Sequence, residues 1–255
     1  MKIYVFDDES QLDVFVGQYL IDFINNHKES TIGFATGSTP LGTYDYLIKA
    51  FEDNKVDFSN VYAFNLDEYV GIPQNHPRSF YKFMQDYLFN KINIPTSHID
   101  ALNGASENMQ EECRRYDEAI KQRPIDIQLL GIGMDGHIAY NEPGSPLDGD
   151  SHVVDLMKES IESSLDYGFD NIQDVPSQGV SQGVGTIMKA KQLIMMAKGE
   201  KKAKLVERML YGPVTSDFPS SVIQQHSNVI VVLDKNAAKY VKETNYEKSI
   251  RNLQF

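Results

Sequence analysis

Cysteine is nearly absent from this 255-residue chain, which contains only Cys113. One cysteine cannot form an internal disulfide, so the composition favours a reducing compartment, and no zinc-ligand spacing surrounds Cys113. No apolar run approaches the ~18 residues that a membrane span needs. The first residues turn acidic after a short apolar stretch, which is unlike a signal peptide. We therefore expect a cytoplasmic protein that does not contact membranes.

Basic residues are also scarce, with 24 Lys and Arg against 36 Asp and Glu, for a net charge of −12. Phosphate backbones and anionic membranes attract basic surfaces, so this charge argues against nucleic-acid and membrane partners. The remaining composition, 41% hydrophobic and 24% charged, is ordinary for a globular protein. A chain of this length can bury its core as one large unit, and we expect a single domain over residues 1–255.

Short runs rich in Val, Ile and Phe alternate with amphipathic stretches, a pattern typical of parallel strands joined by helices. It predicts an α/β fold with an open, mostly parallel, Rossmann-like sheet and helices on both faces. The expected strands are 3–6, 31–35, 61–65, 125–132, 153–156, 193–197 and 229–233, and the expected helices are 12–23, 41–51, 80–88, 109–120 and 203–210. Segments 143–151 and 176–185, rich in Gly, Pro and Ser, are expected to be functional loops.

Ligands of open parallel sheets bind beyond the carboxyl ends of the strands. The first such position holds Thr36, Gly37, Ser38 and Thr39, followed by Pro40 and a helix. With Thr39 as N-cap and Pro40 as the first helical residue, the loop would gather N–H groups and hydroxyls at a helix N-terminus. The segment predicts either a small phosphate-ester site or an ordinary capped turn, and it lacks the Gly-Lys-Ser/Thr end of a nucleotide-binding loop.

The second strand end delivers Asp67 and Glu68. One of these carboxylates is a candidate general base. The alternative is that Asp67 forms a turn and Glu68 lies on the surface. A metal site would need a third converging ligand.

The third strand end carries Gly131, Gly133 and Gly136 in a G-x-G-x-x-G spacing, with Asp155 placed as a ribose-binding acid would be. A dinucleotide site needs a helix of several turns after the glycines. Pro143 and the glycine and proline that follow it forbid that helix, so a nicotinamide cofactor is disfavoured.

The same segment places Asp135, His137 and Glu142 within eight residues. An imidazole flanked by carboxylates can exchange protons near neutral pH. A structural histidine held by local hydrogen bonds is the alternative. A metal site is less favoured, since His137 is the only imidazole in the cluster.

Taken together, these segments resemble the glucosamine-6-phosphate deaminase (isomerase) family. The resemblance rests on GFATGSTP at 33–40, FNLDEYVG at 64–71 and DGHIAYNEP at 135–143, with support from HPRSF at 76–80, GVGT at 183–186 and GEKKA at 199–203. It extends over about residues 30–235. 6-Phosphogluconolactonases share the fold and a related Gly-His loop.

The resemblance implies an enzyme that opens an aminosugar 6-phosphate ring, isomerises it through an enol and releases ammonia, leaving a ketose 6-phosphate. Asp67 would move the C2 proton toward C1, and His137, oriented by Asp135 and Glu142, would handle ring opening. The loop at 36–39 would hold the phosphate, and Lys202 would add a positive charge. Without the resemblance, Lys202 would be interpreted as a solvated lysine at the start of a helix. No metal or organic cofactor is expected. The substrate would be glucosamine 6-phosphate or galactosamine 6-phosphate, and because the family includes monomers and hexamers, a homo-oligomer remains open.

Two departures from the family accompany this resemblance. Asp166 stands where members usually carry a phosphate-binding arginine, and a carboxylate there would weaken phosphate binding by a few kcal/mol unless another cation replaces it. Segment 145–152 lacks the Arg and Lys cluster that binds an allosteric N-acetyl aminosugar phosphate in regulated members, so we predict no such activation. Lactone hydrolysis and a non-catalytic sugar-phosphate sensor are the alternative functions. Asp67 argues against the first, and the clustered proton-transfer groups argue against the second.

Overall fold

A computed structural model describes residues 1–246, apart from the side chains of Asp166 and Tyr167. The expected phosphate-repelling carboxylate of Asp166 and the last part of the expected domain, residues 247–255, therefore lie outside the described residues. Among the described helices, none combines the length and apolar character required to cross a bilayer.

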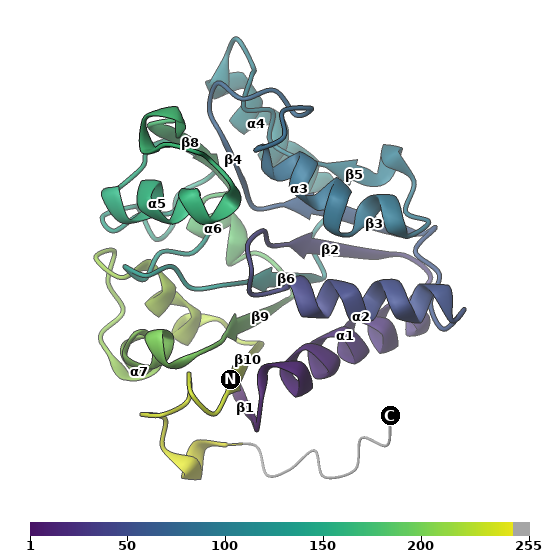
Figure 1. The fold of residues 1–255 in the computed structure, drawn as a ribbon, viewed down its shortest axis with the longest axis vertical. Coiled ribbons are helices and arrows are strands. Elements are labelled where there is room, and N and C mark those ends of the chain that lie inside the picture. Colours follow the sequence, from purple (N-terminus) through teal and green to yellow (C-terminus); the bar gives the residue numbers. More distant parts are fainter. Residues whose placement is uncertain (247–255) are drawn as a thin grey trace.

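The main sheet has seven parallel strands, in agreement with the predicted fold class (Figure 1). Its order across the sheet is β1 (Lys2–Phe6), β10 (Val229–Asp234), β9 (Gln192–Ala197), β6 (Ile127–Leu130), β2 (Ser30–Phe34), β3 (Val61–Asn65) and β5 (Ile99–Asp100). Strands β2, β6 and β10 are buried at every residue, as expected for strands covered on both faces.

Helices flank this sheet and form its outer layers (Figure 1). They are α1 (Glu9–Asn26), α2 (Leu41–Glu52), α3 (Phe80–Tyr87), α4 (Met109–Gln122) and α7 (Ala203–Tyr211), whereas α5 (Lys158–Ser163) and α6 (Val184–Ile187) lie beside the smaller sheet described below (Figure 1). Local capping explains several starts: the side chains of Asp8, Ser79 and Asn108 accept hydrogen bonds from N–H groups in the first turns of α1, α3 and α4. The five predicted helices are therefore confirmed within a few residues.

A second, antiparallel sheet of three strands lies beside the main one. Its order is β4 (Asp67–Tyr69), β8 (Gln178–Ser181) and β7 (His152–Asp155). The strand predicted at 153–156 is therefore real but belongs to this smaller sheet. The interpretation of 176–185 as a loop is wrong in part, because β8 and the start of α6 lie in it. Leu66 alone separates β3 from β4, so the chain passes from one sheet to the other at that residue.

Candidate active site

A cavity of about 730 Å³ opens where β2, β6 and β9 end, at the edge of the sheet predicted to bind ligands. The loops that follow these strands supply its wall, together with Asp67 at the start of β4. Its lining includes 36–40, Asp67, 130–134, His137 and 198–202. Thr36, Gly37, Ser38, Thr39, Asp67, His137 and Lys202 thus share one cavity.

The loop after β2 leads directly into the N-terminus of α2. Gly37 adopts φ +100°, a backbone conformation that side-chain-bearing residues rarely take, so glycine is required at this turn. The prediction of Thr39 as N-cap is wrong, because α2 begins at Leu41, Pro40 precedes it, and no side chain caps the helix. No side-chain acceptor caps this end of α2, although the Leu41 N–H already donates to the carbonyl of Ser38 at 3.4 Å, so the helix end still presents a positive potential to an anion.

Lys202 lies in the short segment that follows β9, lines the cavity and contributes a positive charge. Its Nζ donates a hydrogen bond to the carbonyl of Ile132 at 2.7 Å. Burial lowers the pKa of Lys202 to about 8, although the charge of Asp135 opposes this shift. The side chain is therefore a partly desolvated cation next to the cavity, which is a stronger partner for an anion than a solvated lysine.

Asp67 is the buried carboxylate of the site. It is 7% exposed, and among the described residues its Oδ1 has no hydrogen-bond partner. Burial and, to a smaller extent, the charge of Glu68 raise its pKa, His137 acts in the opposite direction, and the resulting pKa is about 7. A carboxylate in this setting can both accept and release a proton near neutral pH.

Glu68 does not lie on the surface, so that part of the alternative interpretation is wrong. The residue is 1% exposed, and its carboxylate accepts hydrogen bonds from the N–H groups of Tyr69, Phe80 and Tyr81 at 2.9–3.0 Å. Burial raises the pKa of Glu68 to about 7 against the effect of these donors. It therefore fixes the N-terminus of α3 against β4, a role that the sequence did not suggest.

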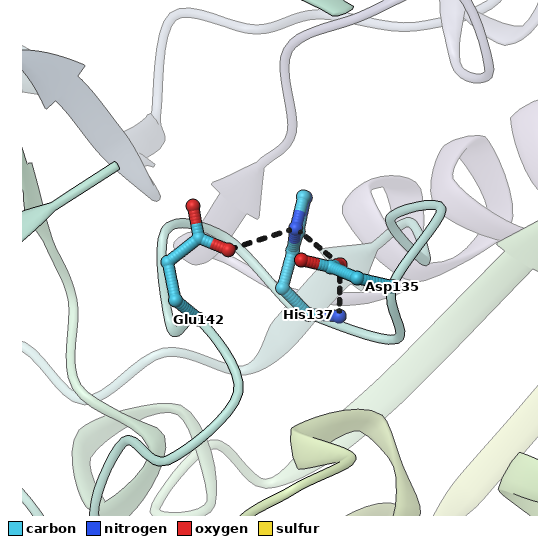
Figure 2. Close-up of side chains that lie close together, drawn as sticks. All are labelled: Asp135, His137 and Glu142. Atoms are coloured by element: carbon cyan, nitrogen blue, oxygen red, sulfur yellow. Dashed lines mark hydrogen bonds and ion pairs between the residues drawn. The ribbon is translucent and has the colours of Figure 1, made fainter. Parts of the chain in front are cut away.

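Asp135 and Glu142 both approach one nitrogen of His137 (Figure 2). The Nδ1 atom lies 2.7 Å from Asp135 Oδ1 and 3.4 Å from Glu142 Oε2. The backbone N–H of His137 donates a hydrogen bond to the same oxygen of Asp135. Burial alone would lower the pKa of His137, but the two carboxylates outweigh it and raise the pKa to about 9. For Asp135 burial acts in the other direction and would raise the pKa, but the contact with His137 holds that pKa well below its usual range. The predicted cluster is thus assembled as a carboxylate-stabilised imidazolium.

Gly133 provides space for this imidazole. A Cβ at position 133 would lie 2.3 Å from Cε1 and Nε2 of His137, so any larger residue would push the ring away. Asp135, His137 and Glu142 also each offer a ligand atom within 4.8 Å of the others, a spacing compatible with a metal ion. Both carboxylates contact the Nδ1 atom itself. The arrangement therefore suits an Nδ1–H that lies between two acceptor oxygens better than a metal ion held by the three residues.

The structure also explains the glycine spacing at 131–136. Residues 131–151 are all described and contain no helix, as expected from the prolines in this segment. Asp155 lies on β7, exposed, where it accepts a hydrogen bond from Gln178 rather than facing a nucleotide. These residues therefore do not form a dinucleotide site.

The loop at 143–151 is held at several points. Gly144 N–H donates to Ser216, and Gly185 N–H donates to Gly149. Ser151 donates through both its N–H and its hydroxyl to Asp117 on α4. Glu142, at the base of this loop, is thus carried by a segment anchored on both sides.

Lys198 is a lining residue that the sequence interpretation missed. It follows β9 directly, so the rule that located the other loops would also have selected it. A lysine after a strand is most often solvated, and residue type alone therefore gave no signal.

Fold and cavity together define a class of protein: an α/β protein whose strand-end cavity is lined by a helix N-terminus, lysines and proton-exchanging groups. The chain belongs to the family described as glucosamine-6-phosphate isomerases/6-phosphogluconolactonase, which matches residues 10–232.

Similar proteins agree with this assignment. The chain is 40% identical over 243 residues to a glucosamine-6-phosphate deaminase of Clostridium perfringens, covering 95% of this chain and all of the relative. It is 38% identical over 251 residues to the enzyme of the same name from Oceanobacillus iheyensis, covering 98% of this chain and all of that one. A solved monomeric glucosamine-6-phosphate deaminase has a TM-score of 0.91 at 34% identity, covering 94% of this chain and 99% of that chain. The 6-phosphogluconolactonase of Trypanosoma brucei shares the fold, with a TM-score of 0.72 at 21% identity and coverage of 94% and 98%.

Proposed function

We propose that this protein is an aminosugar-6-phosphate deaminase/isomerase. It converts glucosamine 6-phosphate, or its epimer galactosamine 6-phosphate, and water into the ketose 6-phosphate and ammonia. One observation carries the proposal: Asp67, a buried carboxylate with a free oxygen, and the imidazole of His137 line the same cavity as the loop at 36–39. Family membership and the deaminase relatives support the choice of substrate.

Ring opening is assigned to His137. Asp135 and Glu142 occupy its Nδ1, so Nε2 is the nitrogen that can exchange a proton with the sugar. With a pKa of about 9, the imidazole is protonated at neutral pH; it can donate a proton to the ring oxygen as the ring opens and be reprotonated by the proton that leaves the C1 hydroxyl.

Asp67 then acts as the base at C2. The open-chain aldehyde acidifies the C2 hydrogen, and the carboxylate removes that proton to give an enol. Returning the proton to C1 produces an imine at C2, and water hydrolyses the imine to the ketone and ammonia. A pKa of about 7 suits both transfers, because the group is neither fully protonated nor weakly basic at neutral pH.

The phosphate is assigned to the loop after β2 and to Lys202, which line the same cavity. Thr36, Ser38 and Thr39 offer hydroxyls, Gly37 brings the backbone close, and the α2 N-terminus and Lys202 supply positive potential. Anchoring the phosphate there would fix the sugar relative to Asp67 and His137.

Ammonia release from each of the two sugars tests the proposal, with wild type and Asp67→Asn measured side by side. We expect turnover of at least one sugar, a loss of orders of magnitude in the variant, and nearly unchanged substrate binding. Asp217→Asn, an exposed aspartate, is the matched control and should behave as wild type.

Other results would contradict the assignment in distinct ways. Binding without turnover in wild type would indicate a sensor. Hydrolysis of 6-phosphogluconolactone without ammonia release would indicate a lactonase. Full turnover in Asp67→Asn would remove Asp67 from the role of base.

A further inference from the structure

An ion pair borders the cavity at residues that the proposed reaction does not use. Lys198 Nζ lies 2.7 Å from both carboxylate oxygens of Asp13, a residue of α1. Each side chain is only 11% exposed. Replacing a buried ion pair with apolar side chains is often neutral for stability, so stability alone gives little reason for this pair.

The pair lies beside the N-terminus of α2. Thr43 Oγ1 donates to Asp13 Oδ1 at 2.9 Å, and this is the same oxygen that Lys198 contacts. At Gly42, an added Cβ would lie 2.1 Å from Asp13 Oδ2, so the helix backbone presses against the carboxylate. Gly42 and Thr43 belong to the first turn of α2, immediately after the loop at 36–39. The Lys198 ammonium is therefore held next to that loop.

Donor counting leaves Lys198 with capacity for a ligand. An ammonium has three N–H donors, and the two oxygens of Asp13 occupy two of them. Lys198 also lines the cavity, together with Thr39 and Lys202. The third N–H is thus available to an oxygen bound at the α2 N-terminus.

Charge balance leads to the same conclusion. Asp13 places a negative charge at the helix end where an anion would bind, which opposes binding unless a cation neutralises it. Lys198, which follows β9 directly, supplies that cation.

We propose that Lys198 is a phosphate-binding residue of this site, and that Asp13 is the positioning residue that holds its ammonium against the first turn of α2. The inference rests on the proposed function for the identity of the substrate. The ligand chemistry itself, a phosphate monoester or inorganic phosphate, can be tested without turnover.

The test compares Lys198→Met with Lys204→Met, which removes the same charge from an exposed position of α7. For glucosamine 6-phosphate, Lys198→Met should raise KM about 10- to 100-fold, as expected for a lost hydrogen bond to a charged group, with kcat changed less than about threefold. Inorganic phosphate should lose affinity by a similar factor in calorimetry. Lys204→Met should match wild type in all three quantities.

A double variant separates binding from folding. Lys198→Met alone leaves Asp13 buried without its partner and can destabilise the fold, whereas Asp13→Asn/Lys198→Met removes both charges and should keep the wild-type melting temperature within a few degrees. The double variant should still bind phosphate 10- to 100-fold more weakly. Wild-type KM and phosphate affinity in that variant would overturn the proposal and leave the pair purely structural.

Failure of the proposed function would give a different pattern. Lys198-dependent binding of inorganic phosphate without ammonia release from wild type would keep Lys198 as a phosphate ligand and reject the deaminase assignment. Ammonia release from wild type together with phosphate binding that does not depend on Lys198 would support the deaminase assignment and reject Lys198 as a phosphate ligand.

Discussion

Replacing the proposed base should make the protein more stable while it removes activity. In the folded protein, burial keeps a proton on Asp67 up to about pH 7, whereas the unfolded chain releases it near the ordinary value of 3.8. Between these values the folded state binds one proton more, so the free energy of unfolding falls as the pH rises. Each pKa unit corresponds to about 1.4 kcal/mol, and the whole effect is therefore about 4 kcal/mol.

Asp67→Asn lacks this titration and keeps a similar shape. We expect its free energy of unfolding, relative to wild type, to increase by about 3 kcal/mol between about pH 4.5 and about pH 8, and to stay level above that. Urea denaturation of wild type, Asp67→Asn and Asp217→Asn across this range measures the difference. The exposed control should follow wild type. A difference between Asp67→Asn and wild type that does not change with pH would refute the claim that burial sets the basicity of Asp67.

Three further predictions concern catalysis. The kcat/KM for glucosamine 6-phosphate should rise through about pH 7 as Asp67 loses its proton and fall through about pH 9 as His137 loses its own; a pH–rate profile without these two limbs would contradict the roles assigned. Gly133→Ala should lower turnover at least about tenfold with the circular dichroism spectrum retained, because the new methyl group would lie 2.3 Å from ring atoms of His137; unaltered turnover would show that the ring position is unimportant. Addition of N-acetylglucosamine 6-phosphate should leave the substrate saturation curve unchanged, and a clear gain in affinity would disprove the absence of activation.

The main sheet was predictable because its strands carry their signal in composition. Strands such as β10 are apolar up to their last residue, here Asp234, and are separated by helices with clear spacing. The short strands β4, β5 and β8 were not predictable in the same way. Strand β8 lies in a Gly- and Ser-rich segment, and its Gly179 leaves room for the ring of Tyr140, where a Cβ would lie 2.6 Å from the nearest ring atom. Whether this segment forms a strand depends on tertiary contacts that the local sequence pattern does not reveal.

The residues of the candidate site also fall into two groups, those that were predictable from the sequence and those that were not. Asp67 and His137 were found because each follows a strand and has a side chain suited to proton transfer. The burial of Glu68 and the contact between Lys198 and Asp13 were not found, since each depends on partners distant in the sequence: Glu68 meets the start of α3, and Lys198 meets α1. Spacing rules detect residues that act within one loop, and they miss residues whose role is set by another element.

The change of sheet at Leu66 has a consequence for inhibitor design. Asp67 belongs to the small antiparallel sheet, while the loop at 36–39 extends from the main sheet, so a molecule that reaches both connects two separately built layers. Once one end of such a molecule is bound, the other end is presented to its own sheet at high effective concentration. A phosphate fragment and a sugar fragment should each bind weakly, and joining them with a linker of the right length should give an affinity well beyond the better fragment. Linker length, rather than added contacts, would then be the main variable to optimise.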